Sequence, residues 1–490
     1  MPALVTDKLK RNFLQDIFDE MKTSTSNYYI CIGRADPWLT TDDTVPDNTP
    51  INSDKEERNA RLSLMSGKKV SDYSFVVPRF NWTSGGIYSQ YDDNRDTTPG
   101  TVGSDNPYPY YVMTDENQVY ICLKQSKATN GVANPSTRQP IGTDDIPRWY
   151  TDGYVWKYLY TVGGARASAF LSANFMPVEY VKKTDAGLNS LQDLQADIRA
   201  KAAPKQMLGI ELISNGAGYT SAPTVTITGN GDSTGVHPYY KLPTATATED
   251  GGIITKIVMD SDALTGALDS CAKFGRNYDY ASVTISGGGA SVNATARAVL
   301  HGNDSGVGAN PIFDLRSTSL MFNIKADGGE AGGDTFRDFP ISNRDYRQVA
   351  LLKDPKGVDS DAGLGQLYTA STGRMQNRIG VTPAAAAGDV ATLATLIDPI
   401  IEQAGGFKAI VSDIDDDKVY YYQNDSTGYT MLNGVDAVTN PAPLSFAVDS
   451  HNYADVDIDK FSGKMIYLEN RAAIERASTQ IDDIKIIITL

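Results

Sequence analysis

The chain has 490 residues, of which 41% are hydrophobic and 21% charged, a balance typical of a folded protein with a large buried core. The formal net charge of −16 argues against a surface built to grip phosphate backbones, so we expect no nucleic-acid partner. Cys31, Cys122 and Cys271 are far apart and odd in number, which favours reduced, buried thiols over a disulfide framework or a zinc site.

The N-terminal residues contain no signal-peptide pattern, and no run of eighteen apolar residues occurs. We therefore expect a protein made in a cytoplasm, with no membrane partner. The high glycine and tyrosine content, 43 and 27 residues, favours strands and turns over long helices.

The first element is expected to be a helix after Thr6 or Asp7, with its apolar face packed on the chain's own sheet. Four apolar residues recur in it at four-residue spacing, Leu9, Phe13, Ile17 and Met21, and Leu14 and Phe18 widen the same face. Residues 27–32 are expected to form a strand that ends at Gly33. Pro37 then fixes a corner that presents Trp38.

Residues 154–162 are predicted to form a strand with an aromatic ladder on one face. By period two, that face holds Tyr154, Trp156, Tyr158 and Tyr160. Such a ladder normally fills a core, although a ligand platform is the alternative.

Residues 205–300 read as two copies of a small β module, because the pattern around Val225 recurs 58 residues later at Val283. Tyr219 and Tyr278 stand at equivalent glycine-rich corners. A tyrosine at such a corner usually packs back on its own sheet, and a glycan-binding role is the alternative.

Further along, residues 320–324 and 347–352 are predicted strands, and residues 384–403 have helical composition. Residues 407–414 and 419–422 are predicted to pair as a hairpin. The C-terminal run alternates, and one face of that strand holds Ile484, Ile486, Ile488 and Leu490. An apolar strand of this kind needs cover from the fold or from a partner.

Tests for chemistry give no strong motif. Asp413, Asp415 and Asp417 alternate, as do Asp455, Asp457 and Asp459, but neither run has the glycine and glutamate of an EF-hand loop. An irregular Ca²⁺ site is the alternative to solvated acidic turns.

No phosphate loop and no H-E-x-x-H or G-x-S-x-G motif occurs. Sixty acidic residues mean that a pair at glycosidase spacing cannot be dismissed. We expect no catalytic residue, no metal and no cofactor.

Four stretches in register carry a resemblance. They are G-K-M-I-Y-L-E-N-R at 463–471 with the final D-D-I-K-I-I-I-T-L, then Gly33 to Trp38, then Asp152 to Leu159, and more weakly Phe339-Pro340 through Asp345-Tyr346-Arg347-Gln348 to Asp354-Pro355. Together they resemble the gene-product-8-type baseplate wedge proteins of contractile-tailed bacteriophages. The resemblance stops between about residues 186 and 300, which indicates an inserted domain.

We therefore expect a mainly β protein with minor α content, built from several domains with mixed or antiparallel sheets. The expected domains are an N-terminal wedge-family region at 1–185, an inserted domain with two β modules at 186–300, and a C-terminal wedge-family region at 301–490 that packs with the first.

The resemblance implies a structural, non-enzymatic subunit of the virion's tail baseplate, assembled in the host cytoplasm. It would homodimerise, contact other wedge proteins and the peripheral fibre-supporting protein, and take part in rearrangement when the tail contracts. The alternative is a carbohydrate-binding or glycan-cleaving tail component that uses the inserted β repeats. The structural or interface candidates are Arg34, Asp36, Trp38, Tyr154, Trp156, Glu469, Asn470 and Arg471. In the structural interpretation, Arg471 offers a bidentate fork to a carboxylate and Asn470 holds a turn by bonding nearby backbone.

Overall fold

The fold is mainly β with minor α, as the sequence predicts: strand residues, at 42%, outnumber helical residues, at 14%, threefold, and several of its sheets are antiparallel. The computed structural model describes residues 6–34, 38, 45, 54–94, 108–182, 184–234, 241–263, 270–302, 305–327, 345–357, 367–368, 372–374, 377–381, 392–393, 400–415, 418–422, 431–440, 444–446, 448–452, 458–475 and 480–490.

The chain forms two compact units. Unit 1 holds residues 1–14, 74–321 and 488–490, and unit 2 holds residues 15–73 and 322–487. The limits fall inside α1 (Asp7–Lys22), β3 (Asp72–Pro78), β17 (Ser319–Asp327) and β30 (Ile481–Thr489). With β8 (Phe175–Pro177), three of these elements form a sheet of order β30-β17-β3-β8. The three-domain division from the sequence stays a prediction.

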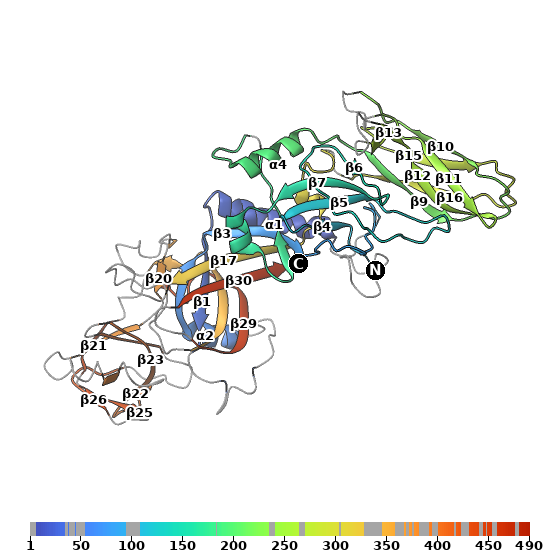
Figure 1. The fold of residues 1–490 in the computed structure, drawn as a ribbon. Helices are drawn as coiled ribbons and strands as arrows, with labels where there is room; N and C mark the ends of the chain where they lie inside the picture. Colours follow the sequence, from blue (N-terminus) through green and yellow to red (C-terminus); the bar gives the residue numbers. More distant parts are fainter. Residues whose placement is uncertain are drawn as a thin grey trace. The chain divides into compact units, whose positions relative to one another are not determined.

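Unit 1 contains an aromatic sheet and a group of hairpins (Figure 1). The aromatic sheet has the order β4 (Tyr111–Met113), β5 (Gln118–Lys124), β7 (Val155–Thr161) and β6 (Arg148–Trp149). A second sheet has the order β10 (Thr224–Gly229), β15 (Ala281–Ser286), β16 (Thr295–Leu300) and β9 (Met207–Ser214). Two further pairs join β11 (Ala245–Asp250) to β12 (Ile253–Met259) and β13 (Ser261–Ala263) to β14 (Ser270–Ala272). The helices are α3 (Gly164–Phe170), α4 (Ser190–Ala200) and α5 (Pro311–Asp314).

The predicted aromatic ladder is core packing. Tyr154, Trp156, Tyr158 and Tyr160 are each at most 2% exposed. The rings of Tyr154 and Trp156 stack at 5.9 Å, and Tyr88 meets both edge-on. α4 covers this sheet and adds Ile198 to the same cluster. A buried ladder of this kind stabilises the sheet and leaves no ring face for a ligand.

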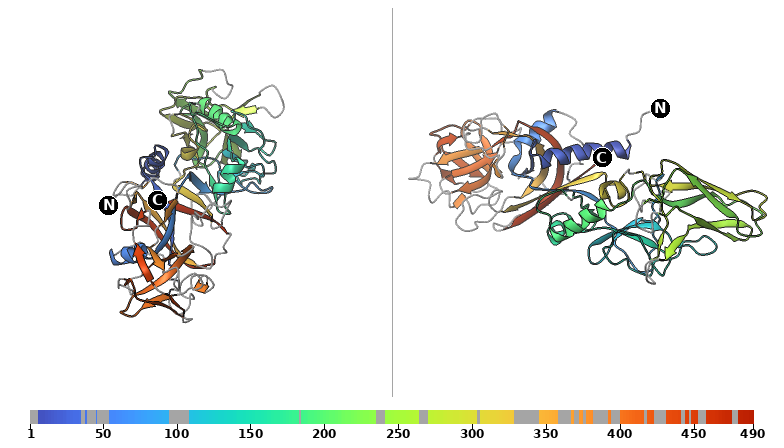
Figure 2. Two further views of the ribbon diagram at one scale, coloured as in Figure 1. Left: turned by 90° about the vertical axis from the view of Figure 1, so that its left-hand side faces the viewer. Right: turned by 90° about the horizontal axis from the view of Figure 1, so that it is seen from above.

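The two predicted β modules pair with each other. β10 and β15 run antiparallel, with Val225 opposite Ile285 and Ile227 opposite Val283. The strands of residues 207–300, green to yellow, stay together in both views of Figure 2. Tyr219 and Tyr278 are 4% and 5% exposed, so both tyrosines pack back on their own sheet as expected.

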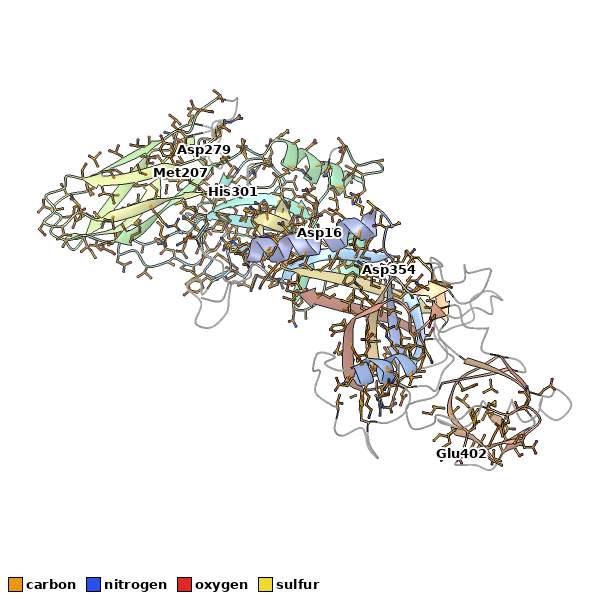
Figure 3. All side chains as sticks on the ribbon, turned by 180° about the vertical axis from the view of Figure 1, so that it is seen from behind. Asp16, Met207, Asp279, His301, Asp354 and Glu402 are labelled. Carbon is orange, nitrogen blue, oxygen red and sulfur yellow. The ribbon has the colours of Figure 1, made fainter. Side chains whose placement is uncertain are left out.

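A buried, hydrogen-bonded pair of side chains supports unit 1 beside these sheets. His301, labelled in Figure 3, shares a hydrogen bond of 2.8 Å between its Nε2 and Asp314 Oδ1. Asp314 Oδ2 accepts a second bond from the Gly308 amide at 2.7 Å. Both side chains of the pair are fully buried, and the rings of Tyr91 and Phe313 flank the imidazole.

Unit 2 contains a five-stranded and a seven-stranded sheet. The first has the order β20 (Thr372–Arg374), β2 (Leu64–Lys69), β1 (Tyr28–Gly33), β18 (Tyr346–Lys353) and β29 (Lys464–Ile474). The second has the order β26 (Ser445–Phe446), β25 (Ala437–Asn440), β22 (Ile400–Gln403), β23 (Lys408–Asp415), β24 (Lys418–Tyr422), β21 (Asn377–Val381) and β27 (Val448–Asn452). β19 (Lys356–Gly357) pairs with β28 (Ile458–Asp459), and α2 (Asp54–Leu62) completes the unit.

Two predictions need correction. Residues 400–403 form β22, not the end of a helix, because they pair with β23 on one side and β25 on the other. In α1, Leu9 and Phe13 are 42% and 52% exposed, whereas Leu14 and Met21 are buried. The contact face of the helix is therefore rotated from the predicted one, and two large apolar side chains remain on its surface.

Other predicted elements are confirmed. The strand at 27–32 is β1, the strands near 320 and 347 are β17 and β18, and β23 pairs with β24 as a hairpin. In β30, Ile484 and Ile486 are buried on one face, as the alternation predicts, while Leu490 is 42% exposed. The backbone amide of Leu490 donates to the Thr318 carbonyl, so the fold itself holds this end of the strand.

Candidate assembly surface

The strand β29, which contains the longest family-like stretch, lies at the edge of its sheet. It pairs with β18 from Lys353 opposite Lys464 to Tyr346 opposite Ile474. Among the strands that the structure describes, it has no neighbour on its other side. Its residues are half-buried or exposed along its whole length, and Ile466 is 42% exposed. A sheet edge with exposed apolar side chains is a surface that another chain can pair with.

A buried arginine fixes the turn that leads into this strand. Arg61 on α2 is 5% exposed and donates to the carbonyls of Lys460, Ser462 and Gly463 at 2.8, 2.8 and 3.0 Å. The carboxylate of Glu57, one turn earlier on α2, also accepts from Arg61 at 2.7 Å. Four bonds to one guanidinium set the direction in which β29 leaves the turn.

Gly463 is required in that turn. Its φ of +68° lies in the left-handed region, where a side chain adds strain. A Cβ at this position would also overlap the carbonyl of Lys353. The turn at Ser462-Gly463 therefore has a steric reason for its glycine.

Trp38 joins the N-terminal family-like segment to β29. Its indole N–H donates to the carbonyl of Arg471 at 2.7 Å, although the two residues are 433 positions apart. The Arg34 guanidinium lies over the indole, with its Cζ 4.1 Å from the ring centroid. Arg34 has a φ of 55°, uncommon for a residue other than glycine, and its amide donates to the Ser63 carbonyl at 2.9 Å. Arg34, Trp38 and Arg471 thus form one contact.

The predicted turn at Glu469-Asn470-Arg471 is wrong, because all three residues lie inside β29. Asn470 Oδ1 accepts from Gln348 Nε2 of the neighbouring strand at 3.0 Å, so it links strands and does not hold a turn. Arg471 approaches Glu469 through Nε alone at 3.6 Å, and its side chain is 49% exposed. The expected bidentate contact is therefore wrong for Glu469, because the guanidinium only lies near this carboxylate, two residues away on the same strand.

Glu469 also accepts from the Tyr467 hydroxyl at 2.8 Å. Burial, and then the Glu469 carboxylate, raise the pKa of Tyr467 to about 12. The phenol therefore stays a neutral donor through the physiological range.

The remaining candidates lie elsewhere. Tyr154 and Trp156 belong to the aromatic core of unit 1 and are at most 1% exposed, so they do not join this surface. Asp36 lies outside the described residues. The candidates that the structure brings together are Arg34, Trp38, Glu469, Asn470 and Arg471.

Two supporting residues were missed in the sequence. Arg61 and Glu57 look like an exposed i, i+4 pair on a short helix, and nothing in the sequence indicates that the guanidinium is buried. Gln348 was noted only as part of the weakest family-like stretch. Charge spacing on a helix could have drawn attention to Arg61, but its three carbonyl partners come from a segment about 400 residues later.

The structure does not test the irregular Ca²⁺ site considered for the two aspartate runs. The side chains of residues 412–418 and 453–457 lie outside what the structure describes. Within the described residues, no group of three metal-ligating side chains comes together. No helix in the part of the chain that the structure covers is long and apolar enough to cross a membrane.

Comparison with known proteins adds no identification. No protein-family model matches the sequence, and no curated protein matches it. The function therefore has to be argued from the residues themselves.

Proposed function

We propose that this chain is a structural subunit of a contractile-tail baseplate wedge, which pairs with a second copy of itself and holds neighbouring wedge proteins together. It would do so in the virion's tail and move with the baseplate on contraction. The proposal rests on the sequence resemblance and on the surface around β29, and it assigns no catalytic step and no cofactor.

One observation carries the proposal. Gly33, Gln348 and Asn470 come from three family-like stretches that are distant in sequence, yet they stand in one row across adjacent strands. Gly33 lies opposite Gln348 in the β1–β18 pair, and Gln348 lies opposite Asn470 in the β18–β29 pair. Trp38 and Arg471 meet beside this row. Stretches that recur together are expected to share one structural task, and here they lie on three adjacent strands of one sheet, of which β29 is the edge strand.

The chemistry of that edge suits protein contact. Arg471 is half-exposed, and Phe461 and Ile466 are 51% and 42% exposed. Aromatic and arginine side chains contribute most of the binding energy in many interfaces. An unpaired strand edge adds backbone groups that a second strand can satisfy. The second copy of the chain is the partner that the resemblance implies.

The test is the mass of the purified chain by light scattering, for wild type and two matched variants. Ile466→Glu places a charge on β29, and Ile213→Glu places the same charge on β9, where the isoleucine is 64% exposed. We expect a dimer for wild type and Ile213→Glu, and a shift toward monomer for Ile466→Glu. A monomeric wild type, or equal behaviour of the two variants, would contradict the proposed surface.

The alternative, glycan binding by the inserted β repeats, depended on Tyr219 and Tyr278, and both side chains are buried. The Tyr219 hydroxyl accepts a hydrogen bond from the Ala294 amide at 2.7 Å, and Tyr278 is equally buried. Neither ring is presented to a sugar. A glycan array on the purified chain still tests that alternative directly.

A further inference from the structure

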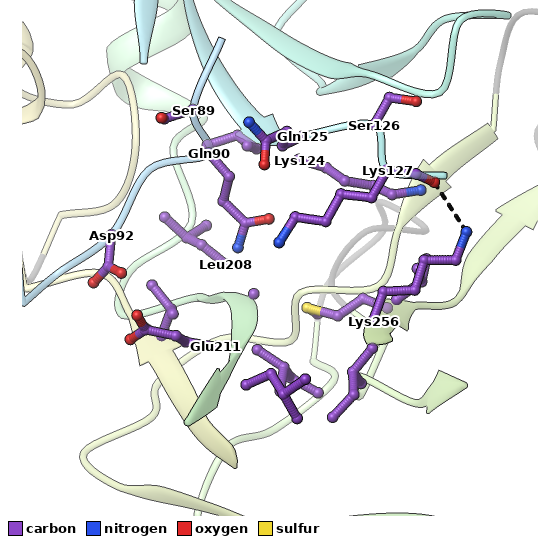
Figure 4. A pocket seen from close by; sticks show the side chains of 18 of the residues that line it. Ser89, Gln90, Asp92, Lys124, Gln125, Ser126, Lys127, Leu208, Glu211 and Lys256 are labelled. Atoms are coloured by element: carbon purple, nitrogen blue, oxygen red, sulfur yellow. Dashed lines mark hydrogen bonds between the residues drawn. The ribbon is translucent and has the colours of Figure 1, made fainter. Parts of the chain in front are cut away.

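A cavity of about 460 Å³ lies inside unit 1, between the aromatic sheet and the hairpins of residues 207–300 (Figure 4). Its walls are residues 89–92, residues 123–127 at the end of β5, and the strands β9 and β12. This volume is within the range of small-molecule sites in proteins. It is independent of the surface around β29.

Close backbone approaches shape the walls. A Cβ on Gly209 would overlap the amide of Gln90, so the glycine is what lets Gln90 extend over β9. A Cβ on Gly153 would lie 2.7 Å from the Ser126 hydroxyl. The Thr255 hydroxyl donates to the Thr129 carbonyl at 2.5 Å. These contacts hold the segment after β5 against β12 and keep the cavity open.

Three lysines line this cavity in a protein whose net charge is −16: Lys124, Lys127 and Lys256. Lys124 Nζ lies 3.4 Å from the centroid of the Trp149 ring, and Lys256 Nζ donates to the Lys127 carbonyl at 3.0 Å. Among the described residues, neither Lys124 nor Lys256 forms a salt bridge. No carboxylate among the described residues therefore neutralises the ammonium groups of these two lysines.

The carboxylates in the same walls are already neutralised. Glu211 accepts from Arg297 Nε at 2.6 Å, and Asp92 accepts from another nitrogen of the same guanidinium. Asp93 completes the cluster at 2.5 Å. Arg297 thus neutralises the carboxylates at one end of the cavity, and the end that the lysines line keeps a positive charge.

We propose that this cavity binds a small hydroxylated molecule that carries an oxyanion, either a phosphate or a carboxylate, through Lys124, Lys127 and Lys256. The Gln90 amide and the hydroxyls of Ser89 and Ser126 supply hydrogen bonds to the rest of the ligand (Figure 4). Sugar phosphates and sugar acids share this chemistry.

The protonation of Lys124 agrees with this assignment. Burial, and then the neighbouring Lys256, lower the pKa of Lys124 to about 7. A buried ammonium beside a second cation is costly, and a bound oxyanion would relieve that cost. The cation–ring contact with Trp149 stabilises the Lys124 ammonium in the absence of a ligand.

The test is isothermal titration of the full chain at low salt with glucose 6-phosphate, glucuronate, inorganic phosphate and glucose. We expect binding of at least one of the three anions and none of glucose. Lys124→Met and Lys256→Met should each weaken the binding by about tenfold or more, because each removes a charged hydrogen-bond donor. Lys8→Met removes an exposed lysine of α1 and should leave the affinity unchanged.

The pattern across the anions identifies the source of the oxyanion. Equal affinity for phosphate and glucose 6-phosphate would assign the site to the phosphate group alone, and preference for glucuronate would assign it to a carboxylate. Binding should also change the fluorescence of Trp149, and Trp149→Phe should remove that change.

Two results would overturn the proposal. One is the absence of binding by every anion to a wild-type chain that melts cooperatively. The other is that both cavity variants match Lys8→Met in affinity while keeping the wild-type melting temperature.

Discussion

Lys157 on β7 is a fully buried cation, and removing its charge should stabilise the protein. Burial lowers the pKa of Lys157 to about 8, and the carboxylates of Asp314 and Asp145 oppose part of that shift. The side chain keeps its charge at neutral pH in a place that has lost most of its water. We therefore expect Lys157→Met, which preserves most of the volume, to raise the free energy of unfolding of unit 1.

The magnitude follows from the pKa difference. The ordinary value is 10.5 and the folded value about 8, and each unit corresponds to about 1.36 kcal/mol. The cost of the buried charge is then on the order of 3 kcal/mol at neutral pH, which is the upper limit of the gain. Asp314 keeps its bonds from His301 and the Gly308 amide in the variant, so the loss of the lysine does not strand that carboxylate.

The same pKa difference fixes how the free energy of unfolding changes with pH. Between pH 8 and 10.5 the unfolded chain keeps a proton on Lys157 that the folded chain has lost, so wild-type stability rises with pH through that window. Lys157→Met lacks this rise. Its advantage should be full at pH 7, shrink above pH 8 and vanish near 10.5. Other groups, such as Tyr111 and Tyr160 with their strongly raised pKa values, contribute equally to both proteins and cancel in the difference.

The assay is urea unfolding followed by tryptophan fluorescence at pH 7, 8, 9 and 10. Trp82, Trp149 and Trp156 all belong to unit 1 and report on it. Lys8→Met is the matched control and should have no effect at any pH. A variant less stable than wild type at pH 7, or a difference that does not change between pH 7 and 10, would refute the reasoning.

Three further predictions follow from single contacts. Arg61→Met leaves three carbonyls of the turn before β29 without their donor, so we expect a loss of about 2–4 kcal/mol and faster hydrogen exchange in that turn; unchanged exchange would contradict it. Asp314→Asn replaces a carboxylate oxygen that takes part in the buried hydrogen bonds with His301 and the Gly308 amide and should cost about 1–3 kcal/mol by urea unfolding, and an unchanged stability would be inconsistent with it. Gly463→Ala should lower the melting temperature more than Gly434→Ala, because both glycines have φ near +70° but only Gly463 faces a backbone carbonyl; equal shifts would contradict the steric account.

Local patterns predicted much of the fold. Period-two alternation identified β7 and β30, and the repeated glycine-rich modules identified β10 and β15, because these signals depend only on neighbouring residues. Residues 400–403 are the exception to this success of local patterns. Residues 400–403 have helical surroundings in the sequence, but their isoleucines pair with two strands, and that long-range pairing overrides local preference.

The candidate site was harder to predict, because its contacts are long-range. The segments around Trp38 and Arg471 were singled out separately, but no local pattern shows that the indole reaches a carbonyl 433 residues away. The same holds for the cavity, since Lys124 and Lys256 come from different sheets of unit 1. A charge pattern in the sequence cannot show that two lysines 132 positions apart line one space.

The central claim is that this chain acts by binding other proteins in an assembly. Cross-linking mass spectrometry on purified tail particles tests it most directly, with Lys464 at the start of β29 as the reporting residue. We predict that the chain is present in the particles and that Lys464 is linked to a second copy or to a neighbouring tail protein. Absence of the chain from the particles, or links from Lys464 only to its own chain, would contradict the account.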